Sequence, residues 1–302
     1  MKGLFLYLCA TAAVLGLALP QVGQTAEFSL DANDGIAFKS ASGNFKARFG
    51  GRLQLDGALF LEDETPLRND AIVRRARLSF RADLFKVWRF SMQYDLADEE
   101  ERYASLWLRY SGFDNIDITI GQFQEPFGLE EATSSNNLIF MERSLANVLA
   151  PGTNVGVGVR LWDEHWSFNT GVFWETYIED PDPFARREGV GVSGRLTYAP
   201  INSKHSVLHL GVSGSYRVPD DSGRVRFRTR PETYVTDERL ISTGRMKDVE
   251  DYFSAGLEAA AMAGSLMVQG EYIKTLVSRT ADRSDESFDG AYVVGPEKRT
   301  SR

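Results

Sequence analysis

A two-residue alternation of apolar and charged side chains constrains the fold of this chain more than any other feature. It is clearest between Asn44 and Phe60. One face of this stretch carries Ala47, Phe49, Gly51, Leu53, Leu55, Gly57 and Leu59. The other face carries Lys46, Arg48, Gly50, Arg52, Gln54 and Asp56. Because side chains of an extended backbone alternate between its two sides, the stretch is predicted to be a long β-strand with one apolar and one charged face.

The alternation returns in later stretches, which are separated by tight turns and by longer charged loops. Strands are predicted at residues 72–85, 88–96, 103–110, 116–122, 155–162, 165–175, 190–199, 206–218, 251–263, 265–278 and 291–294. Residues 27–43 are predicted to be a polar lead without strands. Eleven or twelve strands of this kind predict an all-β chain, a transmembrane antiparallel up-and-down β-barrel. The alternative is a soluble exported β-protein, in which the apolar faces would meet a core.

The first 26 residues have the features of a secretory signal peptide. Lys2 precedes an apolar run from Leu4 to Leu19, and small residues follow Pro20. The only cysteine, Cys9, lies in this segment, so residues 27–302 offer no disulfide and no thiolate metal ligand. No later stretch has 18 continuous apolar residues, so no transmembrane helix is predicted.

The basic residues gather on the charged faces of the early strands, although the whole chain has a net charge of −8. An acidic chain is not expected to bind nucleic acid. In a barrel, the basic residues predicted to line the lumen are Lys46, Arg48, Arg52, Arg75, Arg77 and Arg81. The alternative is structural pairing across strands with Asp56, Asp83 and Asp95. Arg74 interrupts an apolar face and is predicted to lie where its strand meets the polar interface.

Two long connections interrupt the strand pattern. The first, Phe123–Gly152, has no periodicity, and such a length without regular structure is unusual unless it is functional or disordered. Its apolar residues argue for packing, and in a barrel the space for packing is the lumen, so the segment is predicted to be an inward-folded constriction. These apolar residues are Leu138, Ile139, Phe140, Met141 and Leu145.

The second connection, residues 219–250, carries arginine at every second position: Arg224, Arg226, Arg228 and Arg230. In an extended backbone these side chains share one face, about 6.5–7 Å apart. Guanidinium groups stay charged at working pH, and their planar fork matches phosphate or carboxylate oxygens. The four residues are therefore predicted to form an arginine ladder that binds and passes on anions. A solvated basic loop is the alternative.

Four stretches of the chain resemble the phosphate-selective porin O and P family of the Gram-negative outer membrane. They are residues 73–78 (VRRARL), 121–130 (GQFQEPFGLE), 141–145 (MERSL) and 228–232 (RTRPE). The resemblance covers nearly all of residues 27–302 and implies trimers of 16-stranded barrels with inward-folded loops. It carries the arginine ladder over to Arg224, Arg226, Arg228 and Arg230, and the constriction to residues 123–152. The chain departs from the family at its C-terminus, where no terminal strand closes on an aromatic residue, so a truncated barrel is expected.

Together these features predict an anion-selective outer-membrane porin, a passive channel for phosphate or polyphosphate-like anions. The expected partners are those anions, outer-membrane lipid and two further copies of the chain in a homotrimer. No cofactor and no enzymatic activity are expected, because nucleotide, nucleophile and metal motifs are absent from the sequence. His165, His205 and His209 are interpreted as turn or interface residues. An exported soluble anion-binding or structural protein, or a non-conducting barrel fragment, is the alternative.

Overall fold

The structure is a computed structural model that describes most of the chain beyond its N-terminal segment. It describes residues 27–31, 35–61, 67, 69–97, 103–174, 189–220, 222–280 and 283–298. The predicted signal peptide, residues 1–26, lies outside the described residues. So do the charged loop at residues 98–102, most of the loop at 62–70 and the last four residues of the chain.

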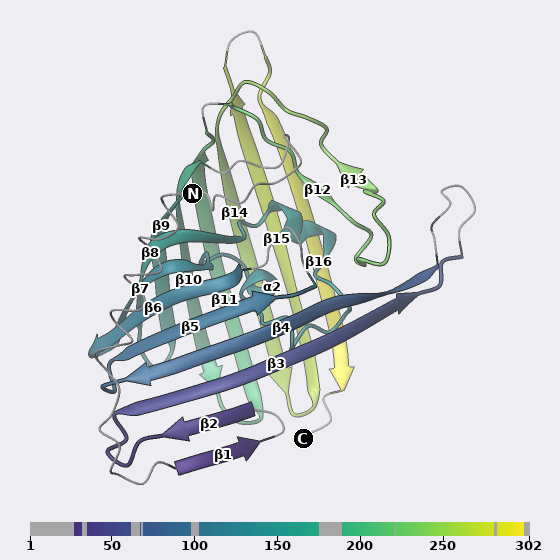
Figure 1. Cartoon of the computed structure of the whole chain (residues 1–302). Coiled ribbons are helices and arrows are strands. Elements are labelled where there is room, and N and C mark those ends of the chain that lie inside the picture. The colour runs from purple at the N-terminus through teal and green to yellow at the C-terminus, as the bar shows by residue number, and fades with distance from the viewer. Residues whose placement is uncertain are drawn as a thin grey trace, which may run out of the picture.

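The described residues form one antiparallel sheet of fourteen strands, in which each strand pairs with the next one along the chain (Figure 1). The strands are β1 (Glu27–Asp31), β2 (Gly35–Lys39), β3 (Phe45–Ala58), β4 (Asp70–Leu84), β5 (Trp88–Asp95), β6 (Tyr103–Phe113), β7 (Ile116–Gln124), β8 (Thr153–Trp162), β9 (Trp166–Trp174), β10 (Val190–Asn202), β11 (Ser206–Val218), β14 (Val249–Ala263), β15 (Leu266–Arg279) and β16 (Glu286–Lys298). The predicted all-β, up-and-down order is confirmed. Within the described residues β1 and β16 do not pair, so the sheet has two edges.

Three predictions about the strands were wrong. The polar lead at residues 27–43 contains β1 and β2, which pair Phe28 with Phe38 and Leu30 with Ile36. The two phenylalanine rings meet edge to face at 5.3 Å, and such cross-strand pairs stabilise strands too short to give a clear periodic pattern. Strand β16 runs from Glu286 to Lys298, well beyond the predicted residues 291–294. The predicted count of eleven or twelve strands was therefore too low.

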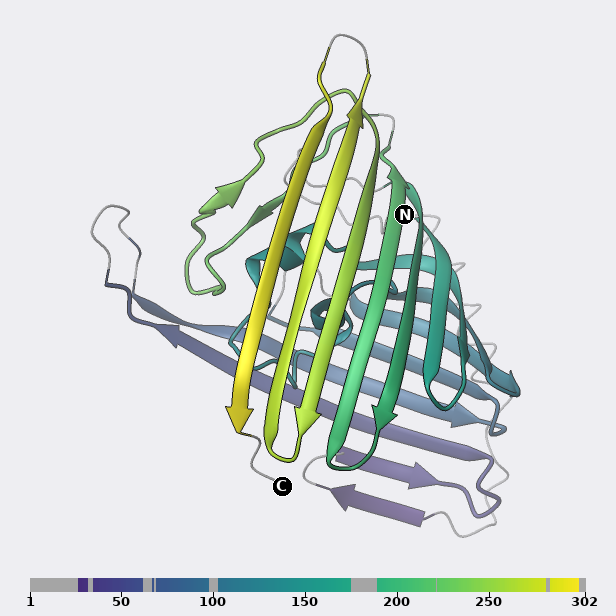
Figure 2. The same cartoon turned by 180° about the vertical axis from the view of Figure 1, so that it is seen from behind.

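The sheet is strongly curved, and the first long connection lies on its concave side. This connection holds one turn of α-helix, α2 (Leu129–Ala132), and a short 3-10 helix, η1 (Leu145–Leu149). Opposite views place α2 between strands β3–β7 and strands β11–β16 (Figures 1 and 2). No helix among the described residues is long and apolar enough to cross a membrane.

The two faces of the sheet have the reverse of the polarity found in a soluble protein. The convex face exposes large apolar side chains, such as Leu78, which is 56% exposed. The buried residues of the concave side are mostly polar or charged and include Ser193, Arg217 and Thr275, each 0% exposed. Apolar side chains outside and polar ones inside are the arrangement of strands that face lipid.

One apolar cluster does lie inside the concavity, where the long connections pack against β14 and β15. It consists of Phe127, Leu149, Ala150, Val225, Phe227, Met246, Val249, Tyr252, Ile273 and Val277. Glycine permits a close approach of η1 to β16: a Cβ at Gly290 would stand 3.0 Å from the Cβ of Ala146 in η1. The cluster therefore fixes both connections to the same side of the barrel wall.

Candidate functional site

The connection between β11 and β14 folds back on itself as a hairpin, here called the ladder hairpin (residues 222–249). Its arms pair through the bridge between Val225 and Met246 and through two short strands. These are β12 (Arg228–Thr229) and β13 (Ile241–Ser242). Val225 and Phe227 are 1% and 2% exposed in the apolar cluster, so the alternating arginines point to the opposite side, as extended geometry requires.

A cavity of about 420 Å³ lies between the ladder hairpin, the segment Glu142–Gly152 and β4; it is called the ladder cavity here. The arginines that line it are Arg74, Arg75, Arg143, Arg226, Arg228, Arg230 and Arg239. The carboxylates that line it are Glu131, Glu142 and Glu232. Among the described lining residues, seven guanidinium groups stand against three carboxylates, so positive charge predominates in this part of the cavity.

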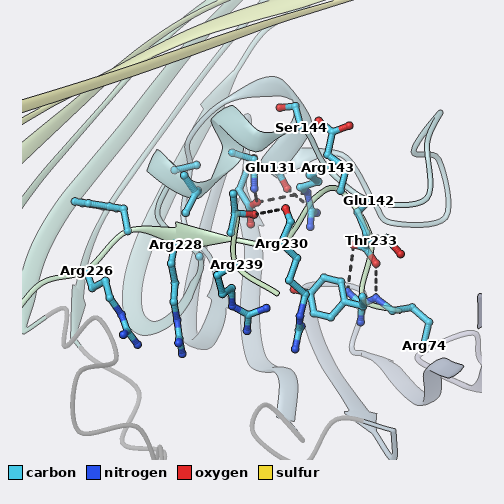
Figure 3. Close-up of a pocket in the computed structure, with 18 of the residues that line it drawn as sticks. Arg74, Glu131, Glu142, Arg143, Ser144, Arg226, Arg228, Arg230, Thr233 and Arg239 are labelled. Carbon is cyan, nitrogen blue, oxygen red and sulfur yellow. Dashed lines mark hydrogen bonds and ion pairs between the residues drawn. The ribbon is translucent and has the colours of Figure 1, made fainter. Parts of the chain in front are cut away.

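Three of the four predicted ladder residues line this cavity, and one residue that the sequence analysis missed joins them. Arg226, Arg228 and Arg230 stand in a row with their guanidiniums on one side, and Arg239 lies between Arg228 and Arg230 (Figure 3). Arg224 is not among the lining residues. Arg239 comes from the returning arm of the hairpin, and only the pairing of the two arms brings it into the row.

Three arginines of the ladder cavity have side-chain donors that no group of the described residues accepts. Among the described residues, Arg75 Nε, Arg230 Nε and Arg239 Nη1 are buried without a hydrogen-bond partner. Burial lowers the pKa of the Arg239 guanidinium, and the positive charges of Arg230 and Arg228 lower it further. Buried donors of this kind cost free energy unless a ligand or water accepts from them. The cavity is therefore built to receive acceptor oxygens.

Arg74 joins the opposite wall of the cavity because β4 has an irregularity at this point. Strand pairing shifts between Gln54, which faces Arg75, and Leu55, which faces Val73. Arg74 is the extra residue, and a bulge of this type redirects a side chain. The prediction that Arg74 lies at the polar interface of the apolar face was wrong: its guanidinium is ion-paired with Glu142 on the concave side.

Glu142 and Tyr234 connect the cavity walls to one another. The Glu142 carboxylate accepts hydrogen bonds from Arg74 and, at 3.2 Å, from Arg75. The Tyr234 ring lies between two guanidiniums, with the Arg74 carbon 3.6 Å and the Arg230 carbon 4.3 Å from its centroid. Cation–π contacts of this type stabilise by roughly 0.5–2 kcal/mol each. Arg230, the last of the alternating arginines, is thereby held close to β4.

The segment Phe123–Gly152 is fixed to both sides of the concavity. On one side, Glu125 forms a fully buried ion pair with Arg217 of β11. The Glu271 carboxylate of β15 accepts hydrogen bonds from the backbone N–H groups of Leu129 and Glu130 at 2.7 and 2.8 Å. On the other side, Glu142 binds β4. Contacts across the whole curved sheet therefore position this segment.

Arg143 and Glu130 organise the same segment internally. The Arg143 guanidinium donates to the carbonyl oxygens of Glu130, Glu131 and Thr133 at 3.0, 3.2 and 3.0 Å. The Glu130 carboxylate accepts from the backbone and the hydroxyl of Ser144 at 2.9 and 2.7 Å. Burial raises the pKa of the Glu130 carboxyl, and these two hydrogen bonds oppose the rise.

The basic residues of the early strands have mixed partners. Arg77 pairs with Asp95 at 2.7 Å, as the structural alternative proposed. Asp83, however, pairs with Arg89 at 2.6 Å, and Asp56 accepts from Gln54 at 3.1 Å. The remaining placements are as follows: Lys46 faces Asp83 across β3 and β4, Arg48 faces Arg81, Arg52 faces Arg77, and Arg75 donates to Glu142.

The histidines lie in turns or in a charge cluster. Nδ1 of His165 is 3.1 Å from the carbonyl oxygen of Ala199, and His205 lies in the turn between β10 and β11. His209 Nε2 lies 2.6 Å from Glu258 Oε1, which also pairs with Arg195. Within the described residues, no group of histidine, cysteine, aspartate or glutamate is arranged to hold a metal ion.

Comparisons with known proteins show the family to which the chain belongs. The family model of the phosphate-selective porins O and P matches residues 47–296. Porin O of Pseudomonas aeruginosa is 26% identical over 288 residues, which are 90% of this chain and 61% of that protein. Two variants of the Rhodopseudomonas blastica porin, 12% and 11% identical, each align over 82% of this chain and 100% of their own, with a TM-score of 0.28. On the extent of the family match, the chain belongs to the phosphate-selective porin O and P family.

Proposed function

We propose that this chain forms an outer-membrane channel that passes phosphate or related anions by diffusion, with the ladder cavity as its selective site. The observation that carries the proposal is the set of buried guanidinium donors at Arg75, Arg230 and Arg239 that no group of the described protein accepts. Family membership and the apolar convex face of the sheet support it. Outer-membrane lipid would cover that face, and assembly as a homotrimer is part of the same proposal.

The arginine ladder is better suited to passing an anion from one guanidinium to the next than to binding it tightly at one place. A channel must bind its ion strongly enough to attract it and weakly enough to release it. Neighbouring arginines allow an anion to exchange one guanidinium for the next. The three lining glutamates weaken the positive potential of the cavity. Planar bidentate forks favour phosphate over chloride, because phosphate presents two separate oxygens to the two parallel N–H groups and chloride is a single acceptor atom.

Reversal potentials in a salt gradient across planar bilayers test the proposal. Replacing Arg226 and Arg228 by alanine should lower anion-over-cation selectivity and weaken the block of chloride current by phosphate. Arginine-to-lysine changes at the same positions should keep anion selectivity but weaken the phosphate block, because the fork is lost. The control is K86A/K204A, which removes two positive charges at the short-turn ends of the sheet. Unchanged selectivity and block in R226A/R228A would contradict the proposal.

The soluble alternative predicts different behaviour. A soluble exported protein would stay monodisperse without detergent, whereas the exposed apolar side chains of the convex face require detergent or lipid. Heat-dependent gel mobility and partition into detergent micelles distinguish the two.

A further inference from the structure

A second cavity lies between strands β6–β10 and the first residues of the segment Phe123–Gly152. Its volume is about 400 Å³, and it is called the aromatic cavity here. No described residue lines both this cavity and the ladder cavity. Its aromatic and apolar side chains include Trp107, Phe123, Pro126, Ala132 and Val159. Its uncharged polar side chains are Thr119, Gln124, Ser167, Asn169 and Thr170. Such a mixture is typical of cavities that bind small organic molecules.

Trp107 is the unusual residue of this cavity. Tryptophan in a membrane barrel is expected where the outer face meets the membrane interface, but Trp107 lies in the middle of β6 and lines a cavity on the concave side. The residues directly opposite it on β5 and β7 are Ser91 and Gly121, which are too small to cover an indole ring. The guanidinium carbon of Arg109 lies 4.8 Å from the ring centroid. The polar side of the barrel wall therefore contains a flat aromatic surface.

The charged groups of the aromatic cavity lie close to groups of opposite sign. Arg160 faces Asp117 across β7 and β8, and its guanidinium carbon lies 4.9 Å from the ring centroid of Trp162. The other charged lining residues form the ion pairs Arg109–Asp117, Arg195–Glu258 and Glu125–Arg217. Positive charge is therefore less concentrated here than in the ladder cavity.

The side chains of the aromatic cavity also include hydrogen-bond acceptors that the described residues do not use. Asn169 makes one long hydrogen bond, from Nδ2 to Ser167 Oγ at 3.4 Å, and no described group donates to its Oδ1. Gln124 donates through Nε2 to Glu131, and its Oε1 likewise accepts from no described group. An acceptor oxygen is satisfied by a ligand that donates, such as a hydroxyl, and not by an ionised carboxylate or phosphate oxygen.

We propose that the aromatic cavity binds a neutral sugar ring. One face of a pyranose ring carries apolar C–H groups, which suit the electron-rich face of the Trp107 indole. The hydroxyl groups at the edge of the ring can donate to Asn169 and accept from Arg160, because a hydroxyl is both donor and acceptor. The combination of a flat aromatic surface with unused acceptors distinguishes this cavity from the ladder cavity, where the unused groups are guanidinium donors.

This inference goes beyond the proposed anion channel and does not depend on it. Sugar binding can be measured on the detergent-folded chain without transport. Bilayer selectivity reports on the ladder cavity, so failure of either idea leaves the other standing.

Isothermal titration calorimetry of the detergent-folded chain tests the inference, with D-glucose as the probe. We expect saturable binding of glucose at one site. Mannitol has six hydroxyl groups but no ring, and it should bind at least about tenfold more weakly because it lacks the flat apolar face. Inorganic phosphate should not displace glucose. Absence of saturable binding, equal affinity for mannitol, or competition by phosphate would each overturn the inference, and none of these outcomes depends on a variant that folds.

Substitutions assign the binding to Trp107. W107A should raise the dissociation constant for glucose about tenfold, and W107F should recover part of the affinity because a flat aromatic face remains. N169A should weaken binding of glucose as well, because one acceptor is lost. The matched control is W174A, which removes a tryptophan that is 46% exposed on the convex face of β9 and should leave glucose binding unchanged. If folded W107A bound glucose as the unmodified chain does, the inference would be wrong.

Discussion

At the scale of single residues, the arginines of the ladder cavity differ in how they are neutralised. Arg230 pairs with Asp237 at 2.7 Å, and Arg74 and Arg75 pair with Glu142. Burial lowers the pKa of Arg239, and the positive charges of Arg230 and Arg228 lower it further, while Tyr234 and Asp237 oppose the shift. Guanidinium groups nevertheless remain charged at working pH. Arg239 therefore adds positive charge to the cavity.

Replacing Arg239 by alanine should lower anion-over-cation selectivity in bilayers by about as much as the loss of one predicted rung, such as R228A. It should leave Tm unchanged or slightly raised, because the mutation relieves repulsion from Arg228 and Arg230. The matched control is R283A, an exposed arginine ion-paired with Asp248 away from the ladder cavity. If R239A and R283A had the same anion-over-cation selectivity, Arg239 would make no specific contribution to selectivity.

Tyr234 should position the ladder hairpin through its ring. The face of a phenyl ring attracts cations nearly as well as that of a phenol, so Y234F should keep the contacts with Arg74 and Arg230. Y234A should lose them and speed hydrogen exchange at the hairpin amides of Val225 and Met246, which pair across the two arms. Equal exchange in Y234A and the unmodified chain would mean that the apolar cluster alone holds the hairpin.

At the scale of elements, the segment Phe123–Gly152 acts as a brace across the concavity. Removing one partner of a buried ion pair usually costs about 3–5 kcal/mol, and this segment supplies the buried Glu142, which pairs with Arg74 and Arg75. Deleting residues 132–147 removes Glu142 and should therefore both lower stability and open the lumen. We expect higher single-channel conductance, while F140A, which changes a 61%-exposed side chain, should conduct normally. Unchanged conductance in the deletion would place the segment outside the ion path.

Long strands could be predicted from the sequence, but short or irregular ones could not. Strands β3 and β11 match their predicted bounds closely because each repeats its alternation over many residues. Strands β1 and β2 are five residues each, too few for periodicity to outweigh neighbouring turn residues. Strand β16 was underestimated because its inner face includes Gly290, which is small in order to admit η1.

The candidate site was predictable only where it depends on local geometry. Alternation alone places Arg226 and Arg228 opposite Val225 and Phe227. The positions of Arg239 and Arg74 depend on how two hairpin arms pair and on an irregularity in β4, and such non-local features leave no periodic signal in the chain.

At the scale of the whole molecule, polar residues face the concave side of the sheet and large apolar residues face outward. This reversed arrangement is stable only if lipid, and not water, covers the convex face. The curved sheet then needs no large apolar core, and the small cluster around Phe127 serves to anchor the two long connections. The ladder cavity lies on the polar side, where charged groups can be kept hydrated.

The sharpest test of this arrangement is to place a charge on the convex face at two depths in the bilayer and to compare how much stability each change costs. Val212 and Val218 lie on the same strand and are equally exposed, at 48% and 46%, but Val212 is central and Val218 is at the strand end. Arginine near the bilayer midplane costs about 2–4 kcal/mol, and near the interface about 0–1 kcal/mol. Denaturant unfolding in lipid vesicles should therefore show V212R destabilised by about 2–4 kcal/mol and V218R by no more than about 1 kcal/mol. In a soluble protein both exposed changes would stay within about 0.5 kcal/mol, so equal and small effects would refute the membrane-embedded barrel.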